Sequence, residues 1–351
     1  MTRPAESLTR DQLLEMYYFA RLARSIEERL VLLFRQSKVV GGLYRSLGQE
    51  GESVATAYAL EKTDAILPLI RNMGALTTMG VRPREIFLQY MARAESNSRG
   101  RDLNIHIVNL PREGAQAPVI VGPISMLGDS IPVAAGIAMG ARMRSIRKPL
   151  VAMAWIGDGA TSTGAFHEGM NFAAVQKAPL VVIAEDNKYA YSTPIAKQMA
   201  IARIDERAAA YGIPHEMVDG NDMLAVYDVA KRMVDRARAG EGASLVGVDT
   251  MRMQGHAQHD DARYVPKAML DEWSRKDPIT RFRDWLVERA VGTPQDLDDI
   301  DDMCKTYAAE EAGLAEESPM PDPATVSRGV YAGDDFAQPA IEFVKSPFST
   351  P

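Results

Sequence analysis

The stretch WIGDGATSTGAFHEG, residues 155–169, decides the fold of this sequence, because an apolar run ends there at Gly-Asp-Gly and a helical pattern follows. The residues before the motif, PLVAMAWI, have the length and composition of a buried strand. Ligands of an open parallel sheet bind at the carboxyl ends of its strands. Gly157 and Gly159 let the backbone approach a ligand closely, and the N-terminus of the next helix favours a phosphate. The stretch therefore predicts a ligand site at the end of a strand.

Short apolar runs alternate with helical patterns from about residue 64 onward. Strands are expected at 65–70, 150–156, 180–185, 213–218 and 244–250, and helices at about 130–147, 163–177, 200–211 and 222–239. This alternation is typical of parallel strands that are covered by helices on both faces. We therefore predict an α/β fold, with a parallel sheet flanked by helices on both faces and with N- and C-terminal helical extensions.

The two ends of the chain carry the predicted extensions. Apolar positions repeat at helical spacing over residues 8–36, and a small-residue helix is expected at about 50–60. After about residue 265 the pattern is helical and acidic, and the tail from 318 is rich in proline. We expect this tail to be extended, and to wrap a neighbouring chain or fray. The expected regions are 1–62, a helical segment and pocket loop; 63–265, the ligand-binding α/β domain; and 266–351, helices and tail.

The composition excludes several classes of function. The 351 residues carry a formal net charge of -7, which argues against nucleic acid as the main partner. The single cysteine, Cys304, allows no intrachain disulfide. No apolar run approaches the roughly 20 residues that a membrane-spanning helix needs, and the first residues lack the apolar core of a signal peptide. We expect a cytoplasmic protein that does not bind membranes.

Asp158, between the two glycines, predicts a metal ion. A carboxylate repels a phosphate, so a divalent cation between the two anions resolves the conflict. The next strand ends in Asn187, about one helix and one strand later, so two neighbouring strand ends carry Asp158 and Asn187. Oxygens from these two side chains, a backbone carbonyl near Tyr189, two phosphate oxygens and a water form the octahedral set that Mg²⁺ prefers.

A dinucleotide site is the main alternative for a Gly-x-Gly motif after a strand. The third position of that fingerprint is Ser162 here, where glycine or alanine is expected. A dinucleotide also leaves Asn187 without a role. The sequence therefore disfavours an NAD-dependent dehydrogenase.

Gly-Asp-Gly followed by Asn at the end of the next strand resembles the binding motif for thiamine diphosphate and Mg²⁺. Further matching stretches are LGQEGESVATAYAL, GPISMLGDSIPVAAGIAMGA, VDGNDMLAVYDVAKR, MRMQGHAQHDDARY and WSRKDPITRFRDWL. From about residue 10 to 332 the chain resembles the alpha subunit of the thiamine diphosphate-dependent, decarboxylating first component of 2-oxo acid dehydrogenase complexes. The resemblance implies the thiamine diphosphate-binding fold, of which residues 63–265 would be the phosphate-binding domain.

The resemblance also implies roles for residues around the cofactor. Arg71 would clamp the diphosphate, while Gly157, Asp158, Gly159 and Ala160 form the motif itself. Asp158, Asn187 and Tyr189 would bind the metal.

Residues outside the motif would act on the coenzyme ring and the substrate. Ser125 and Leu127 match positions where the backbone holds the aminopyrimidine ring, although Leu127 can equally be a core residue. His256 matches a loop histidine that reaches the diphosphate and the reacting centre. His106 matches a histidine near the substrate entrance, with a structural role in its loop as the alternative.

The implied reaction is the oxidative decarboxylation of a small 2-oxo acid. The cofactor accepts the electron pair as carbon dioxide leaves, and the acyl group passes to the lipoyl group of the acyltransferase component. In this family, the glutamate that activates the coenzyme comes from a beta subunit. The resemblance thus predicts a heterotetramer of two alpha and two beta chains, with the single chain inactive.

The motifs GRDLNIH, PISML and YAYSTP look most like the branched-chain, 2-oxoisovalerate type. A pyruvate or acetoin dehydrogenase alpha subunit is the alternative, and a non-catalytic binding subunit is a second one. Gly41 and Gly42 stand where relatives often place a bulky aromatic residue. Either the smaller side chains admit a larger acyl group, or another residue fills the gap.

Overall fold

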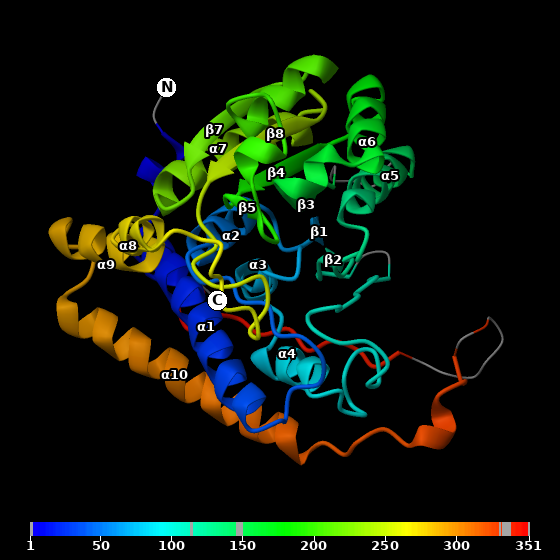
Figure 1. Ribbon diagram of the computed structural model, residues 1–351, viewed down its shortest axis with the longest axis vertical. Helices are drawn as coiled ribbons and strands as arrows, with labels where there is room; N and C mark the ends of the chain where they lie inside the picture. The colour runs from blue at the N-terminus through cyan, green and yellow to red at the C-terminus, as the bar shows by residue number, and fades with distance from the viewer. Residues whose placement is uncertain (1–2, 113–114, 145–149, 330, 332–337, 350–351) are drawn as a thin grey trace.

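A six-stranded sheet forms the centre of the computed structural model, which describes residues 3–112, 115–144, 150–329, 331 and 338–349 (Figure 1). The strands are β1 (Ala65–Leu67), β2 (Val119–Ile120), β3 (Ala152–Gly157), β4 (Leu180–Asp186), β7 (His215–Asp219) and β8 (Ser244–Asp249). Their spatial order is β2-β1-β3-β4-β8-β7, and each neighbouring pair is parallel. The predicted α/β fold with a parallel sheet is confirmed.

Alternating side chains of the central strands enter two separate cores. Ala152, Ala154 and Ile156 pack with α5 (Ser130–Met143) and α6 (Gly164–Val175), which lie side by side on one face of the sheet (Figure 1). Met153 and Trp155 point to the other face. The helices there are α2 (Glu50–Tyr58), α3 (Met73–Thr78) and α7 (Met223–Arg238). Because both faces of β3 are buried, its sequence is apolar throughout.

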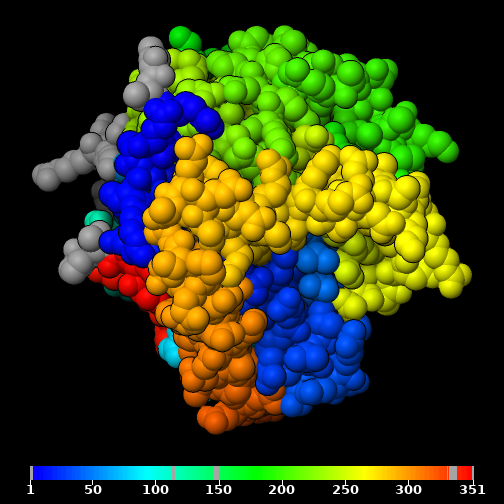
Figure 2. Space-filling view, turned by 90° about the vertical axis from the view of Figure 1, so that its left-hand side faces the viewer, coloured from blue at the N-terminus to red at the C-terminus, as the bar shows by residue number. Residues whose placement is uncertain are grey.

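The long N-terminal helix α1 (Arg10–Arg35) packs against the C-terminal helices. Thr9 and Gln12 form a capping box at its start. The C-terminal group consists of α8 (Lys267–Ser274), α9 (Pro278–Glu288) and α10 (Pro294–Glu317), which form one side of the molecule in Figure 2 (orange) next to the N-terminal segments (blue). The remaining α-helix, α4 (Pro83–Tyr90), contacts α10. The helical extensions are therefore present at both ends of the sequence.

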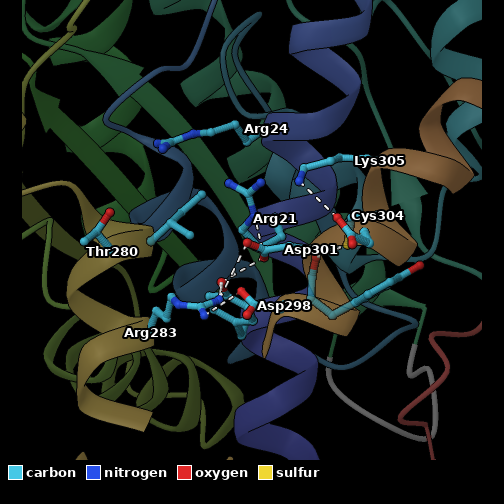
Figure 3. A network of polar contacts seen from close by, with 12 residues as sticks. Arg21, Arg24, Thr280, Arg283, Asp298, Asp301, Cys304 and Lys305 are labelled. Atoms are coloured by element: carbon cyan, nitrogen blue, oxygen red, sulfur yellow. Dashed lines mark hydrogen bonds and ion pairs between the residues drawn. The ribbon is translucent and has the colours of Figure 1, made fainter. Parts of the chain in front are cut away.

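Ion pairs join α1 to the C-terminal helices (Figure 3). Arg21 of α1 lies 2.8 Å from Asp301 of α10, and the Tyr17 hydroxyl donates to the same carboxylate at 2.8 Å. Arg283 of α9 pairs with Asp298 at 2.8 Å. The acidic character of α10 is thus matched by arginines on two neighbouring helices. The one cysteine of the chain lies buried beside this network.

Several elements differ from the sequence-based prediction. The helix expected at 200–211 is the 3-10 helix η5 (Ile204–Tyr211), and the other 3-10 turns are η1 (Pro4–Ser7), η2 (Leu127–Asp129), η3 (Gly159–Ser162), η4 (Ile195–Lys197) and η6 (Pro323–Thr325). The edge strand β2 and the small hairpin of β5 (Tyr189–Ala190) and β6 (Thr193–Pro194) were not predicted. Two-residue strands have too little sequence for a period to be visible. Positions 145–147 of the helix expected at 130–147 lie outside the described residues.

The C-terminal tail is extended, as expected, but residues 338–349 lie against their own chain. The backbone N–H of Val344 donates to the carbonyl of Gly80 at 2.7 Å, and that of Arg82 donates to the carbonyl of Glu342 at 3.0 Å. The Ser349 hydroxyl donates to Glu15 of α1 at 2.9 Å. The expectation that the tail frays is therefore wrong for this segment, while contact of the tail with a neighbour stays a prediction. Within the described residues, no helix combines the length and apolarity needed to cross a membrane.

Candidate functional site

Asp158 and Asn187 follow two neighbouring strands at the same edge of the sheet. Gly157 at the end of β3 pairs in register with Glu185 of β4, and the backbone N–H of Asp158 donates to the Glu185 carbonyl at 3.0 Å. Both Asp158 and Asn187 are buried. The structure thus places the two residues at adjacent carboxyl ends, where an open parallel sheet binds its ligands.

The carboxylate of Asp158 is held by two hydrogen bonds. Its Oδ1 accepts from the backbone N–H of Gly159 at 2.8 Å, and its Oδ2 accepts from Nε2 of Gln198 at 3.0 Å. Burial raises the pKa of Asp158 to about 6, because the charged form loses its water. A cation beside the carboxylate would favour the charged form and reverse this shift.

Asn187 presents an oxygen that has no hydrogen-bond partner among the residues that the structure describes. Its Oδ1 is buried, while its Nδ2 lies 3.5 Å from Oε1 of Gln49. A buried acceptor without a partner is costly unless a ligand satisfies it. The carbonyl of Tyr189, also buried, accepts from Nη1 of Arg252 at 3.2 Å and keeps a second lone pair.

These three oxygens suit a hard divalent cation as ligands. A carboxylate, an amide oxygen and a carbonyl are the oxygen ligands that Mg²⁺ takes from proteins. The described residues contain no cluster of three or more His, Cys, Asp or Glu side chains suited to a metal. The predicted set has a single carboxylate, so it does not require such a cluster.

The two glycines of the motif differ in their surroundings. A Cβ on Gly157 would meet nothing within 4 Å, so space lies open beside the strand end. A Cβ on Gly159 would come within 2.4 Å of Cβ of Ala190, so only glycine fits there. Ala160 follows in η3, and Thr163 caps the N-terminus of α6. The site therefore combines free space, a tight turn and a helix start, a combination that suits a phosphate group.

Two buried guanidinium groups, those of Arg71 and Arg252, also belong to this region. Arg71 follows β1 and donates through Nη2 to the carbonyl of His256, while its Nε has no partner. Arg252 donates to the carbonyls of Tyr189 and Tyr191. In the part of the chain that the structure describes, neither guanidinium has a carboxylate within ion-pair distance. Burial and the nearby Arg252 lower the pKa of Arg71 to about 10, so an anion between the two arginines would be strongly favoured.

His256 lies directly beside Arg71. Its ring contacts those of Tyr191 and Tyr44, with centroids 4.5 and 5.5 Å away, and its Nδ1 is buried with no partner in the described part of the chain. Burial, Arg71 and Arg252 together lower the pKa of His256 to about 4. The imidazole is therefore neutral at pH 7 and has one nitrogen available to a ligand.

Three other predicted residues are placed less centrally. His106 contacts Asp102 through Nδ1 at 2.8 Å, and its carbonyl accepts from Gln89 at 3.3 Å, so these contacts hold its own loop. Ser125 is exposed. Leu127 is partly buried against the larger core, which agrees with the core alternative. The segment of Ser125 and Leu127 nevertheless reaches the start of α6, because the adjacent glycine, Gly128, packs on Thr163.

Tyr44 is a site residue that the sequence analysis missed. Its ring lies 5.8 Å from the Arg71 guanidinium, and a Cβ on Gly42 would come within 2.8 Å of that ring. A Cβ on Gly41 would likewise meet Leu103 at 2.7 Å. Other residues thus fill the gap beside the glycine pair, which was the second of the two alternatives. An aromatic residue two positions after the glycines was the available signal.

The sequence of this chain is similar to those of known proteins. The family model described as "Dehydrogenase E1 component" matches residues 18–324. The chain is 34% identical over 331 residues to the 2-oxoisovalerate dehydrogenase subunit alpha of Bacillus subtilis (strain 168), covering 93% of this chain and 98% of that protein.

Two pyruvate dehydrogenase E1 component subunits alpha are also similar. The one from Staphylococcus aureus (strain Mu50 / ATCC 700699) is 37% identical over 287 residues, covering 81% of this chain and 72% of that protein. The one from Acholeplasma laidlawii is 32% identical over 291 residues, covering 82% and 79%.

Proposed function

The chain belongs to the dehydrogenase E1 component family, and from that premise we propose that it is the alpha subunit of a thiamine diphosphate-dependent 2-oxo acid dehydrogenase. The observation that carries the proposal is the pair of buried oxygens at neighbouring strand ends, the Asp158 carboxylate and the unpartnered Oδ1 of Asn187. Arg71 is also buried, its Nε has no partner among the described residues, and it would receive the diphosphate.

The proposed roles divide the site into a metal side and a phosphate side. Asp158, Asn187 and the carbonyl of Tyr189 hold Mg²⁺, and Arg71 and His256 contact the diphosphate. The open space beside Gly157 and the turn at Gly159 and Ala160 receive the diphosphate oxygens. The backbone at Ser125 and Leu127 holds the aminopyrimidine ring.

Thiamine diphosphate, when bound, supplies the electron sink that lets a 2-oxo acid lose carbon dioxide. The chain contributes orientation, charge and control of protons. His256 is kept neutral by burial and by Arg71 and Arg252, so its free Nδ1 can accept a proton or a hydrogen bond from a ligand. The rings of Tyr44 and Tyr191 pack against the imidazole and help to hold its orientation.

We infer that the substrate is a branched-chain 2-oxo acid of the 2-oxoisovalerate type, whose acyl group passes to a lipoylated acyltransferase. The Bacillus subtilis relative of that name matches 93% of this chain and nearly its own full length. Pyruvate is the second candidate, because the Staphylococcus aureus relative is 37% identical over a shorter region. Turnover of a panel of 2-oxo acids with a dye acceptor separates the two, and faster turnover of pyruvate would overturn the branched-chain assignment.

The proposal includes a beta subunit, with two alpha and two beta chains in the active enzyme. The described residues form one six-stranded sheet and one two-stranded hairpin, which correspond to a single cofactor-binding half. Decarboxylation at a normal rate by the purified single chain would contradict this part of the proposal.

A thermal shift experiment tests the cofactor directly. Thiamine diphosphate with Mg²⁺ is expected to stabilise the chain, by about 2.7 kcal/mol at a ligand concentration 100 times the Kd. EDTA should abolish the effect, and NAD should have none. Stabilisation by NAD alone would show that the dinucleotide alternative is correct.

A further inference from the structure

A side-chain amide can serve a metal ion in only one of its two orientations. The oxygen of Asn187 must face the cation, because the NH₂ group is a donor and repels it. The two orientations have nearly the same shape, so packing alone does not choose between them. The hydrogen bonds around the amide decide which end faces the site.

Glu185, two residues before Asn187, sets the direction of these bonds. Its side chain is buried behind the strand end and accepts two hydrogen bonds. Oε1 accepts from Nδ2 of Asn72 at 2.7 Å, and Oε2 accepts from Nε2 of Gln49 at 3.1 Å. Because a carboxylate oxygen accepts and does not donate, Gln49 must turn its NH₂ group toward Glu185.

The orientation of Gln49 then fixes that of Asn187. With its NH₂ group on Glu185, Gln49 presents Oε1 to Nδ2 of Asn187, 3.5 Å away. The other end of the Asn187 amide, Oδ1, is left buried and without a partner. Reversing Gln49 would set an oxygen against the Glu185 carboxylate and an NH₂ group against another NH₂ group, and both contacts are repulsive.

The backbone around Gln49 holds its side chain in place. Gly48 has a φ of +94°, and a Cβ there would come within 2.6 Å of the Met251 carbonyl. The Gly48 N–H donates to Glu50 at 2.8 Å, and Glu50 is paired with Arg24 at 2.7 Å. Gln49 itself is fully buried at the N-terminus of α2. A rigid turn therefore delivers the amide to the space between Glu185 and Asn187.

We propose that Gln49 is a positioning residue for the metal site, which together with Glu185 holds the Asn187 amide with its oxygen turned toward the cation. The inference rests on the proposed function, because the cation is the Mg²⁺ of that proposal. Gln49 touches no substrate or cofactor atom in this role. It acts through Asn187, so its loss should weaken metal binding more than it affects the chemical step.

The test is calorimetric titration of Mg²⁺ into the full chain, together with its beta partner, at saturating thiamine diphosphate. Gln49→Met keeps the size of the side chain and removes both hydrogen bonds. We expect the Kd for Mg²⁺ to rise about 10- to 100-fold, as is common when a residue supporting a metal ligand is lost. At saturating Mg²⁺ the kcat should return close to that of the wild type.

Gln89→Met is the matched control. Gln89 is equally buried, and its amide holds the backbone carbonyls of Asp102 and His106 at 3.0 and 3.3 Å. This variant loses the same groups at the same depth but should leave the Kd for Mg²⁺ unchanged. A rise in Kd of the same size in both variants would mean that Gln49 acts only through general stability, and it would overturn the inference.

Glu185→Gln tests the chain of hydrogen bonds from its other end, and it also serves if Gln49→Met does not fold. An amide at position 185 no longer imposes a direction on Gln49, so the Kd for Mg²⁺ should rise. The double variant should bind Mg²⁺ no more weakly than Gln49→Met alone, because both changes break one chain. Fully additive effects would contradict this reasoning.

The outcomes separate this inference from the proposed function. If the wild-type chain binds no Mg²⁺ with the coenzyme, the proposed function fails and the inference fails with it. If the wild type binds Mg²⁺ and a folded Gln49→Met variant binds it equally well, only the role of Gln49 is wrong.

Discussion

Replacing Asp158 by asparagine should make the cofactor-free chain more stable and abolish its response to the cofactor. The pKa of Asp158 is about 6 in the folded chain, against 3.8 for an unperturbed aspartate. Because the folded pKa is the higher one, the folded state favours the protonated form, and stability is lost as pH rises from 3.8 through 6. At about 1.4 kcal/mol per pH unit, the loss is about 3 kcal/mol at pH 8 and about half of that at pH 5.

Asp158→Asn removes this penalty because the new side chain carries no charge. Its oxygen can keep the hydrogen bond from the Gly159 N–H. The amide of Gln198 can turn over to accept from the new NH₂ group, since its Oε1 is buried without a partner. The variant should therefore gain nearly all of the about 3 kcal/mol of unfolding free energy that the wild type loses at pH 8. The gain is reduced by the free energy of the hydrogen bond that Gln198 now makes with the carbonyl of Thr193, which is lost when the amide turns over.

Urea unfolding at pH 5, 6.5 and 8 measures this gain, first with EDTA and then with thiamine diphosphate and Mg²⁺. The stability difference between variant and wild type should grow with pH in EDTA, and only the wild type should gain stability from the cofactor. Asp271→Asn, which changes an exposed carboxylate on α8, is the control and should shift stability by less than about 0.5 kcal/mol. A variant that is less stable than the wild type at pH 8 in EDTA would refute the argument from burial.

Three further changes are informative. Arg71→Met should weaken diphosphate binding and raise the pKa of His256 above about 4, because one of the two positive charges beside the imidazole is lost; an unchanged histidine titration by NMR would contradict this. Tyr44→Ala removes the ring beside Gly42 and should raise kcat/KM for longer 2-oxo acids relative to pyruvate; an unchanged ratio in the substrate panel would show that Tyr44 does not limit the acyl group. Glu52→Gln should flatten the pH dependence of stability above about pH 4.5. Burial and Glu185 raise the pKa of Glu52 well above its usual 4.5, so the folded wild type loses stability as pH rises. Identical urea midpoints for variant and wild type from pH 5 to 8 would contradict the burial of an acid here.

The sequence predicted the sheet well because each central strand is buried on both faces. Such strands are continuous apolar runs, and the helices between them have a clear period. The segment at 200–211 failed as an α-helix prediction because a 3-10 helix of alanine and charged residues has the same composition. The tail was misjudged because its anchors, such as Glu15 and Gly80, lie far away in the chain and give no local signal.

The site was predictable only where residues follow strands. Asp158 and Asn187 could be brought together because parallel strands end at one edge. Gln49 could not, since its partners Glu185 and Asn187 are 136 and 138 residues away and it precedes a helix instead of following a strand. Tyr44 was also missed, although it stands two positions after Gly42. The strand topology thus predicts which residues lie at the strand ends. The residues that orient those side chains lie on loops from other layers.

The candidate site contains several polar groups whose burial costs free energy when no ligand is bound. Within the described ranges of the chain, Asn187 Oδ1, Arg71 Nε and His256 Nδ1 are all buried without partners. The pKa of Asp158 is raised and those of Arg71 and His256 are lowered, so burial disfavours the charged form of each group. A core that evolved for stability alone would replace these groups by apolar ones. Buried oxygens and buried cationic side chains together agree with the proposed ligand, which carries both a divalent cation and a polyanion. That pairing of opposite charges is what a metal-bound diphosphate supplies, and it satisfies both sides of the site at once.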